Sequence, residues 1–297
     1  MSERLTKCPL CKSGNILNHQ LIKDHAVSKK EFTLCRCNDC ELLFTNPRPT
    51  EEEIGPYYEF KEYYSHEDQV RSFTQWLYQK IRKSSIQRKV GLIESLVKNG
   101  SLLDYGCGTG EFLQEAKRHH WTVRGIEPSE KARAQAVGKL PNEVVGTITE
   151  VPVLETYDVV TLFHVLEHIH SLRKTVKKLV NHLKSNSYMV IAVPNPESAD
   201  AAHYGSAWAG YDVPRHLYHF SQKSMTVFQA QFGLELVRVE PLVYDSYYVS
   251  LLSEGYKNPK TGLISRYFKA IIQGYRSNRK AMKPGDYSSN IFIFKKK

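Results

Sequence analysis

Four of the six cysteines form two Cys-x-x-Cys pairs near the N-terminus, Cys8 with Cys11 and Cys37 with Cys40, separated by 25 residues. This spacing is typical of a metal site, because each short turn directs two sulfurs toward one point. Four thiolates complete the tetrahedral coordination of zinc and leave no position open for water. We therefore expect a structural zinc ion on these four residues and treat Cys35 as a spare thiol. A metal-free redox pair is the alternative.

A second pattern with chemical content is Asp104-Tyr105-Gly106-Cys107-Gly108-Thr109-Gly110, which follows a short apolar run and precedes a helix-forming segment. Glycines at these places let the backbone turn tightly and approach a ligand at a helix start, where free amide groups collect. The chain contains no G-x-x-x-x-G-K-[ST] sequence, which argues against a nucleotide-hydrolysing loop. The dinucleotide pattern G-x-G-x-x-G would need a glycine at Glu111, and a carboxylate there would repel a pyrophosphate. A phosphate-free ligand with a cationic sulfonium, such as S-adenosylmethionine, avoids this repulsion.

The loop resembles that of the class I S-adenosylmethionine-dependent methyltransferases, which carry an acid-x-G-x-G-x-G sequence after their first strand. The resemblance covers about residues 99–241 and implies a Rossmann-like α/β fold with helices on both faces of the sheet. It also implies that the methionine and ribose part of the cofactor lies against Asp104, Gly106, Gly108 and Gly110. Glu127, 17 positions after Gly110, would hold the ribose hydroxyls. NAD enzymes also use an acid at this position, so Glu127 does not discriminate between S-adenosylmethionine and NAD as the ligand.

The segment from Tyr157 to His168 resembles the fourth-strand region of the ubiquinone-type and related small-molecule methyltransferases. This resemblance implies that Phe163 and His164 flank the cofactor and the mouth of the active site. One departure concerns adenine recognition: many relatives have an acid after the glycine that ends the third strand, whereas Thr147 follows that glycine here.

Residues that could act on the methyl acceptor are concentrated between Tyr204 and Phe220, within an insertion that we expect at about 197–221. Transfer from a sulfonium mainly requires alignment, and a base is needed only where the acceptor has a proton to lose. Residues from Arg215 onward resemble the histidine and aromatic segment of sugar methyltransferases that also begin with a four-cysteine zinc module, although Arg215 replaces an acid of those relatives. We predict His216 as the base and His164 as a secondary catalytic candidate. A packed, hydrogen-bonded role is the alternative for both.

The chain divides by pattern into three segments. Residues 1–50 read as a zinc-binding module, residues 51–98 as a helical linker with a helix from about 71 to 98, and residues 99–297 as the methyltransferase domain. In the last segment, short apolar runs alternate with helical stretches, which is the βαβ pattern of a parallel sheet. Runs at 234–240 and 290–294 would complete that sheet.

The charge of the chain is concentrated at its C-terminal end. Residues 253–297 carry nine of the ten net positive charges. Apolar residues from Ile264 to Tyr275 follow helical spacing, and we expect this helix to pack its apolar stripe on the sheet with its basic side in solvent. Contact with an anionic membrane surface is the alternative, and RNA is disfavoured because the N-terminal module is only mildly basic. Without an 18-residue apolar run or a secretory signal, we expect a soluble cytoplasmic protein.

Together these patterns predict transfer of a methyl group from S-adenosylmethionine to an oxygen or carbon of a small-molecule acceptor, such as a sugar, quinone or secondary metabolite. Three alternatives remain open at this point. An RNA or protein methyltransferase would use the zinc module and the basic C-terminus to hold its substrate. A non-catalytic module would bind the cofactor without turnover, and an NAD-dependent enzyme ranks third because of Glu111.

Overall fold

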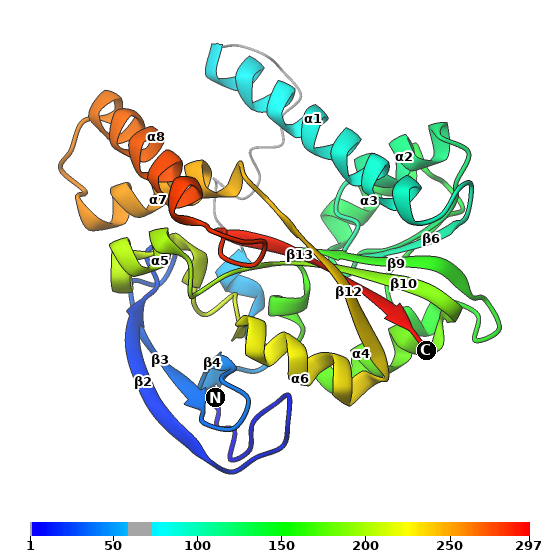
Figure 1. Cartoon of the computed structure of the whole chain (residues 1–297), viewed down its shortest axis with the longest axis horizontal. Helices are drawn as coiled ribbons and strands as arrows, with labels where there is room; N and C mark the ends of the chain where they lie inside the picture. Colours follow the sequence, from blue (N-terminus) through cyan, green and yellow to red (C-terminus); the bar gives the residue numbers. More distant parts are fainter. Residues whose placement is uncertain (1, 59–72) are drawn as a thin grey trace. The chain divides into compact units, whose positions relative to one another are not determined.

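The computed structural model describes residues 2–58 and 73–297, and the side chains of all of these except 73–81. The chain forms two compact units (Figure 1). Unit 1 consists of Met1–Tyr63, His164–Thr175 and Ile191–Phe294, and unit 2 consists of Tyr64–Phe163, Val176–Val190 and Lys295–Lys297. Each unit therefore combines segments that are far apart in the sequence.

Unit 2 contains a parallel sheet with connecting helices. Strand β6 (Ser101–Tyr105) pairs in parallel with β7 (Thr122–Ile126) and β9 (Tyr157–Phe163), and β7 pairs with β8 (Val144–Val145). The helices between the strands are α2 (Glu111–Arg118) and α3 (Glu130–Lys139). The buried face of α2 consists of Phe112, Leu113 and Ala116, and the Oγ of Ser129 caps α3 by accepting from the Ala132 amide. The alternation of strand and helix confirms the predicted Rossmann-like fold.

Strand β10 (Leu183–Pro194) begins in unit 2 and ends in unit 1. The full sheet order is β12-β13-β10-β9-β6-β7-β8, with β12 at Leu234–Pro241 and β13 at Ser289–Lys296. Both late strands were predicted and are confirmed. The predicted long helix is α1 (Phe73–Leu96), in which Val90 and Ile93 are buried, whereas the linker residues 59–72 lie outside the described part of the chain.

Unit 1 contains a small antiparallel sheet in the order β11-β4-β3-β2. Its strands are β2 (Ile16–Lys23), β3 (Glu31–Cys37), β4 (Leu43–Thr45) and β11 (Tyr218–His219), and a separate pair joins β1 (Ser2–Glu3) to β5 (Arg48–Pro49). In the β4–β11 pair, Tyr218 lies opposite Phe44 and His219 lies opposite Leu43. The cysteine-containing segment and the predicted acceptor insertion therefore share one sheet, which the patterns in the sequence did not indicate.

The remaining elements of the described chain are short helical segments and four longer helices. They are η1 (Gly55–Tyr58), η2 (Ile148–Glu150), η3 (Leu166–His168), α4 (Leu172–Asn181), α5 (Ala199–Tyr204), η4 (Gly205–Ala207), η5 (Ala209–Tyr211), α6 (Gln222–Phe232), α7 (Asp245–Lys257) and α8 (Leu263–Lys280). None of the helices in the described ranges is long and apolar enough to cross a membrane.

Helix α8 does not pack as predicted. Its apolar stripe is exposed, with Ile264 at 77% and Phe268 at 66% of their accessible surface, and its buried residues are Ala270, Gln273, Gly274 and Ser277. The prediction that the apolar stripe covers the sheet is therefore wrong. Small residues form the packed face because they allow α7 and α8 to approach closely.

A buried carboxylate ties several elements of unit 1 together. Asp200 on α5 is fully buried and accepts hydrogen bonds from Trp208 Nε1 at 2.8 Å, from Ser277 Oγ on α8 at 2.7 Å, and from Ser288 Oγ at 2.7 Å. These three donors satisfy both carboxylate oxygens, so the buried charge is compensated by hydrogen bonds from three separate segments.

Replacing this carboxylate should destabilise unit 1. In Asp200→Ala, the buried donors of Trp208, Ser277 and Ser288 lose their acceptor, and we expect the free energy of unfolding to fall by about 3 kcal/mol or more. Urea unfolding followed by circular dichroism measures this change. Glu235→Ala removes an exposed acid and serves as the control, because it should change stability by less than about 0.5 kcal/mol. Equal stability of the two variants would contradict the structural role of Asp200.

Candidate functional site

The glycine loop of unit 2 is shaped by its backbone. Gly106, Gly108 and Gly110 have φ angles of 78°, 55° and 79°, a region that other residues rarely adopt. The Gly106 amide donates to the carbonyl of Ile126 at 2.7 Å, which holds the loop against the end of β7. A Cβ at Gly110 would lie 3.1 Å from the Cβ of Ala136 on α3. The predicted glycines therefore permit both the turn and the close packing of the helices around it.

Two buried acids lie beside this loop. Asp104, at the end of β6, accepts a hydrogen bond from Thr161 Oγ1 at 2.6 Å. Glu127, just after β7, accepts from the Gly108 amide at 2.8 Å and from the Ser129 amide at 2.9 Å. Burial raises the pKa of Asp104 to about 6, although the Thr161 hydroxyl opposes the shift, and burial also raises the pKa of Glu127. The structure thus brings together the sequence-predicted acids and glycines at the carboxyl edge of the parallel strands, where α/β folds bind ligands.

Glu111 is not an isolated charge at the start of α2. Its carboxylate lies 2.7 Å from Arg82 Nη2 on α1 and 3.6 Å from Lys139 Nζ on α3. An acid in the first turn also interacts favourably with the helix dipole. These contacts weaken the repulsion that Glu111 would exert on a phosphate, so the case against a dinucleotide rests more on the missing glycine than on charge.

Phe163 lies at the end of β9, in the same unit as the loop. Its ring packs edge-to-face against Phe112 with centroids 5.3 Å apart, and Lys89 Nζ lies 4.2 Å from its ring centroid. The aromatic ring is therefore held from two sides by residues of α1 and α2, which fixes the end of β9 beside the glycine loop's helix.

His164 is the first residue of unit 1 after Phe163 and has a positive φ of 57°. Its Nε2 lies 3.2 Å from Asp245 Oδ2 on α7, and its Nδ1 lies 3.6 Å from Glu167 Oε1. Desolvation alone would lower the pKa of His164, but the carboxylates of Asp245 and Glu167 raise it to about 10. His164 is thus a cation at neutral pH and is poorly suited to accept a further proton.

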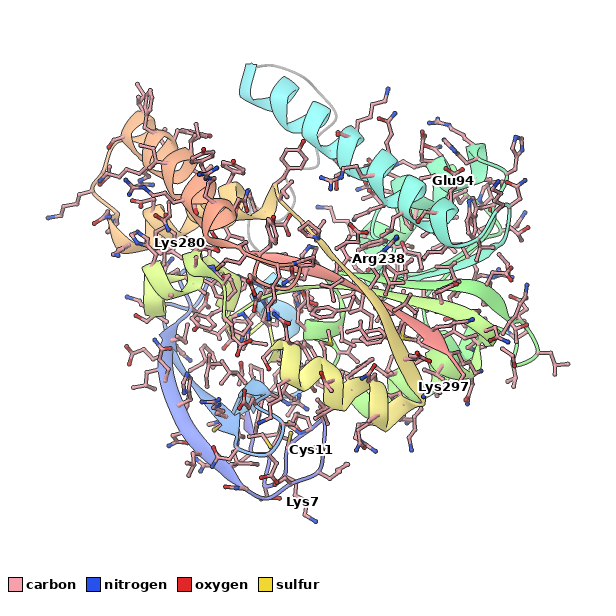
Figure 2. All side chains as sticks on the ribbon, viewed as in Figure 1. Lys7, Cys11, Glu94, Arg238, Lys280 and Lys297 are labelled. Carbon is pink, nitrogen blue, oxygen red and sulfur yellow. The ribbon has the colours of Figure 1, made fainter. Side chains whose placement is uncertain are left out.

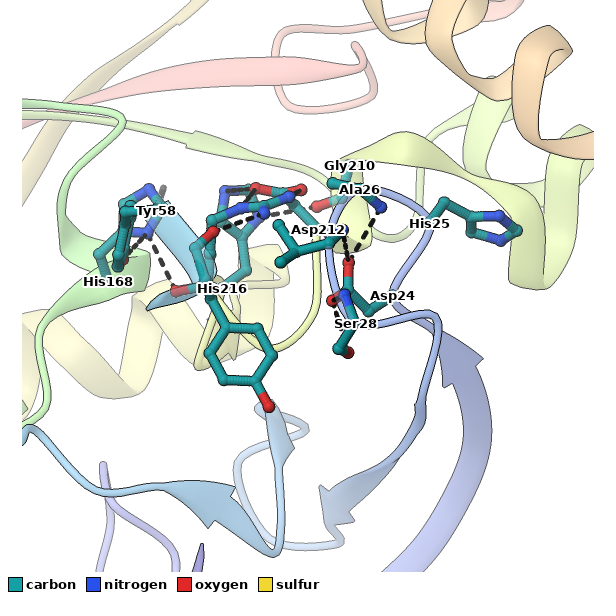
Figure 3. Close-up of polar contacts among 12 residues, drawn as sticks. Asp24, His25, Ala26, Ser28, Tyr58, His168, Gly210, Asp212 and His216 are labelled. Atoms are coloured by element: carbon teal, nitrogen blue, oxygen red, sulfur yellow. Dashed lines mark hydrogen bonds and ion pairs between the residues drawn. The ribbon is translucent and has the colours of Figure 1, made fainter. Parts of the chain in front are cut away.

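His216 has a different environment. Its Nδ1 donates to the carbonyl of Gly210 at 2.9 Å, which leaves the lone pair on Nε2, 3.9 Å from Asp212 Oδ2 (Figure 3). Arg215 forms a bidentate ion pair with Asp212, and its Nη1 donates to the carbonyl of Tyr57 at 2.9 Å. Asp212 therefore places one carboxylate beside both Arg215 and His216.

Sequence reasoning did not identify Glu167 as a site residue. It is fully buried, and within the described part of the chain neither of its carboxylate oxygens accepts a hydrogen bond. One polar side-chain atom from each of Glu167, His168 and His216 lies within 4.8 Å of the other two. Burial alone would raise the pKa of Glu167, but His164, with His168 and His216, holds it at about 2. An acid directly after the apolar pair Val165 and Leu166 was the signal that could have revealed it.

Two other histidines of this region, His168 and His219, are neutral. His168 Nδ1 lies 3.0 Å from the carbonyl of Arg215 and 3.1 Å from Tyr58 Oη, and burial together with the nearby His216 lowers its pKa to about 4 (Figure 3). Burial lowers the pKa of His219 to about 3. The cluster of His164, Glu167, His168, His216 and His219 thus contains both a cationic and two neutral imidazoles around one buried carboxylate.

The four predicted zinc ligands lie together in unit 1. Cys8 Sγ is 3.5 Å from Cys40 Sγ, Cys11 Sγ is 3.5 Å from Cys37 Sγ, and all four sulfurs lie within 4.8 Å of one another. The pKa of Cys8 is lowered to about 5, chiefly because the Cys40 thiol donates a hydrogen bond to it. Cys35 is outside this cluster and donates to Asn18 Oδ1 at 3.4 Å. Four converging, largely buried sulfurs are the donor set that a structural zinc ion requires.

The two cysteine turns share the same backbone geometry. In each, the residue after the second cysteine has a positive φ, 70° at Lys12 and 60° at Glu41. In each, the amide of that residue donates to the carbonyl of the first cysteine, from Lys12 to Cys8 at 3.0 Å and from Glu41 to Cys37 at 2.8 Å. Both turns are therefore closed in the way that directs two sulfurs to one side.

Comparison with known proteins agrees with this geometry. A family model described as a methyltransferase domain matches residues 60–239. The ubiquinone biosynthesis O-methyltransferase of Rickettsia canadensis is 25% identical over 181 residues, which cover 56% of this chain and 75% of that protein. The dTDP-4-amino-2,3,4,6-tetradeoxy-D-glucose N,N-dimethyltransferase of Saccharopolyspora spinosa is 29% identical over 97 residues, 31% of this chain and 39% of that protein.

Among solved structures, a methyltransferase from Thermotoga maritima aligns over 76% of this chain and 98% of its own, with a TM-score of 0.48 at 18% identity. Because the family model matches more than half of the chain and spans the glycine loop, both acids and the fourth-strand segment, the chain belongs to the methyltransferase-domain family and is an S-adenosylmethionine-dependent methyltransferase.

Proposed function

We propose that this enzyme transfers the sulfonium methyl group of S-adenosylmethionine to an oxygen or carbon of a small-molecule acceptor such as a sugar, a quinone or a secondary metabolite. The observation that carries the proposal is the arrangement of Asp104 and Glu127 on either side of the glycine loop. The names of the quinone and amino-sugar relatives support a small acceptor.

In this proposal the cofactor lies against Asp104, Gly106, Gly108 and Gly110, with Phe163 and His164 flanking it. The cationic methionine part faces the Asp104 carboxylate, which is favourable because opposite charges attract strongly at a buried site. Glu127 holds the ribose hydroxyls. Each of its oxygens already accepts one backbone amide and still has a lone pair for a hydroxyl donor.

Where the acceptor has a proton to lose, we assign its removal to His216. The hydrogen bond from Nδ1 to Gly210 fixes the tautomer and leaves Nε2 as the basic atom. Asp212 and the buried Glu167 carboxylate stabilise the imidazolium that forms, in the way an acid supports histidine in other catalytic pairs. Glu167 is thus a positioning residue. His164, already protonated, contributes positive charge and remains the secondary candidate.

The proposal is tested by label transfer from methyl-tritiated cofactor into a host-cell extract, followed by separation into small-molecule, lipid, RNA and protein fractions. We expect label in the small-molecule or lipid fraction. Label confined to RNA or protein would replace the small acceptor by a macromolecule, and absent cofactor binding would overturn the proposed cofactor site.

Once an acceptor is known, His216→Gln should lower kcat by about 100-fold or more, because general bases contribute on this scale, while cofactor affinity stays within about twofold. The matched control is His19→Gln, at an exposed histidine, which should leave kcat unchanged. Full activity of His216→Gln would show that His216 is only a packed residue.

We also propose that Cys8, Cys11, Cys37 and Cys40 hold one structural zinc ion. Metal analysis of the purified protein should give one zinc per chain, and Cys37→Ser should lose it together with part of the stability, since metal binding contributes directly to folding. Cys35→Ser is the matched control, because Cys35 is buried in the same sheet but outside the cluster. Zinc loss in both variants, or in neither, would contradict the assignment.

The raised pKa of Asp104 leads to a further prediction. Between its ordinary pKa and about pH 6, the folded protein holds a proton that the unfolded chain has lost, so the free energy of unfolding falls as pH rises through this range and is lowest above it. Asp104→Asn keeps an acceptor for Thr161 but removes the buried charge. We expect it to raise unfolding stability at pH 8 by roughly 1–3 kcal/mol and to have little effect near pH 4.

The same substitution should weaken cofactor binding by about tenfold or more, because the neutral amide no longer attracts the cationic ligand. Thermal unfolding at several pH values and titration calorimetry with the cofactor measure the two effects. The charged groups that act on Asp104, Lys89 and Glu127, are kept in the variant, so both effects are attributed to the Asp104 carboxylate. A variant that is less stable at pH 8 and binds cofactor normally would contradict the assigned role.

A further inference from the structure

Helix α8 presents its apolar residues outward and its small residues inward. Its packed side lies against α7, where Ser246 Oγ donates to the carbonyl of Gly274 at 3.3 Å and a Cβ at Gly274 would lie 2.9 Å from Tyr247 Cα. The outward row is 44–77% exposed and consists of Leu263, Ile264, Tyr267, Phe268, Ile271, Ile272 and Tyr275. We call these seven residues the outer row. Such a continuous exposed apolar surface marks an interaction site.

Basic side chains accompany the outer row. Lys269, Arg276 and Lys280 recur at spacings of seven and four, so they follow one line along the helix, and all three are exposed. Arg266 and Arg279 add two further positive charges, and α8 contains no acid. Figure 2 shows Lys280 at the end of this helix. The helix thus combines an apolar face with a purely cationic flank.

We propose that α8 binds the surface of an anionic lipid membrane, with the outer row buried at the boundary between headgroups and acyl chains. A helix with an apolar face and a Lys/Arg-rich polar side lies in the plane of such a surface. Each basic residue near anionic lipid adds about 1 kcal/mol, and tyrosine rings such as those of Tyr267 and Tyr275 favour the interface. Helix α8 lies beyond residue 239, outside the region that the family model matches.

Two other occupants fit less well. In a twofold-symmetric dimer the outer row would be buried against itself, but the basic line of Lys269, Arg276 and Lys280 would gain no counter-charge, because α8 contains no acid. RNA would neutralise the basic residues but would leave the seven apolar side chains in water. An anionic membrane both neutralises the basic residues of α8 and removes its apolar side chains from water.

The test is sedimentation of the full-length protein with phosphatidylcholine vesicles, with or without about one third phosphatidylglycerol. We expect binding to the anionic vesicles, little binding to phosphatidylcholine alone, and weaker binding as salt rises. The double variant Ile264→Glu/Phe268→Glu should bind at least about tenfold more weakly, because both side chains lose their burial in lipid. Lys269→Glu/Arg276→Glu/Lys280→Glu should abolish the preference for phosphatidylglycerol.

The matched control is Val153→Glu/Leu154→Glu, which changes two apolar residues that are 87% and 94% exposed in unit 2. This variant should bind vesicles like the unaltered protein. The thermal unfolding temperature and the cofactor affinity should be unchanged in all variants, which shows that each variant is folded. Absent vesicle binding, or equal loss in the control, would overturn the proposal. Dimerisation in ultracentrifugation that is lost in Ile264→Glu/Phe268→Glu would assign the outer row to a second copy instead.

Discussion

The backbone of residues 106–110 is the constraint on which the proposed cofactor site depends. Positive φ at three glycines lets the chain reverse directly after β6, so that α2 begins beside the strand ends. The same turn presents the Gly108 amide to Glu127 and leaves room for α3 at Gly110. A side chain at Gly110 would press on α3 as well as distort the loop, whereas at Gly108 the cost would come from the positive φ alone. In the proposed site, backbone conformation therefore sets the position of the loop before the two acids act.

In unit 1, the histidine cluster shows how burial and nearby charges give chemically identical side chains different pKa values. His164 is held as a cation by two carboxylates, whereas His168 and His219 are kept neutral because burial, together with the nearby His216, outweighs the opposing effect of Glu167 and Asp212 on their pKa values. Groups whose pKa values are pushed apart in this way can give and take protons at the same pH. The buried carboxylate of Glu167 is common to these environments, which explains why one acid in an apolar segment matters for several histidines.

Much of the fold could be predicted because it follows local rules. The short apolar runs became the parallel strands, and the paired cysteines converged as their spacing indicated. The partners of His164 and His216 could not be predicted, since Asp245 lies far along the chain and Asp212 acts through a turn. The periodicity of α8 revealed a stripe but not which face packs, because Ala270, Gly274 and Ser277 make the tighter contact. The catalytic role of His216 stays a prediction for the same reason. The sequence gives the residue type but not the distance from its Nε2 to an acceptor atom.

The pairing of β4 with β11 has a consequence for how the protein is made. Residues 43–45 can pair with β3 as soon as they are made, but their other edge gains its partner only after residues 218–219 have been synthesised, so the N-terminal sheet keeps one open edge through most of translation. Non-local pairings of this kind form slowly, and open strand edges invite aggregation until they close. The N-terminal cysteine segment therefore depends on β11 to complete its sheet. A shortened or transplanted version would carry the unpaired edge permanently, which makes co-expression with the missing strand, rather than simple truncation, the sound route to studying it.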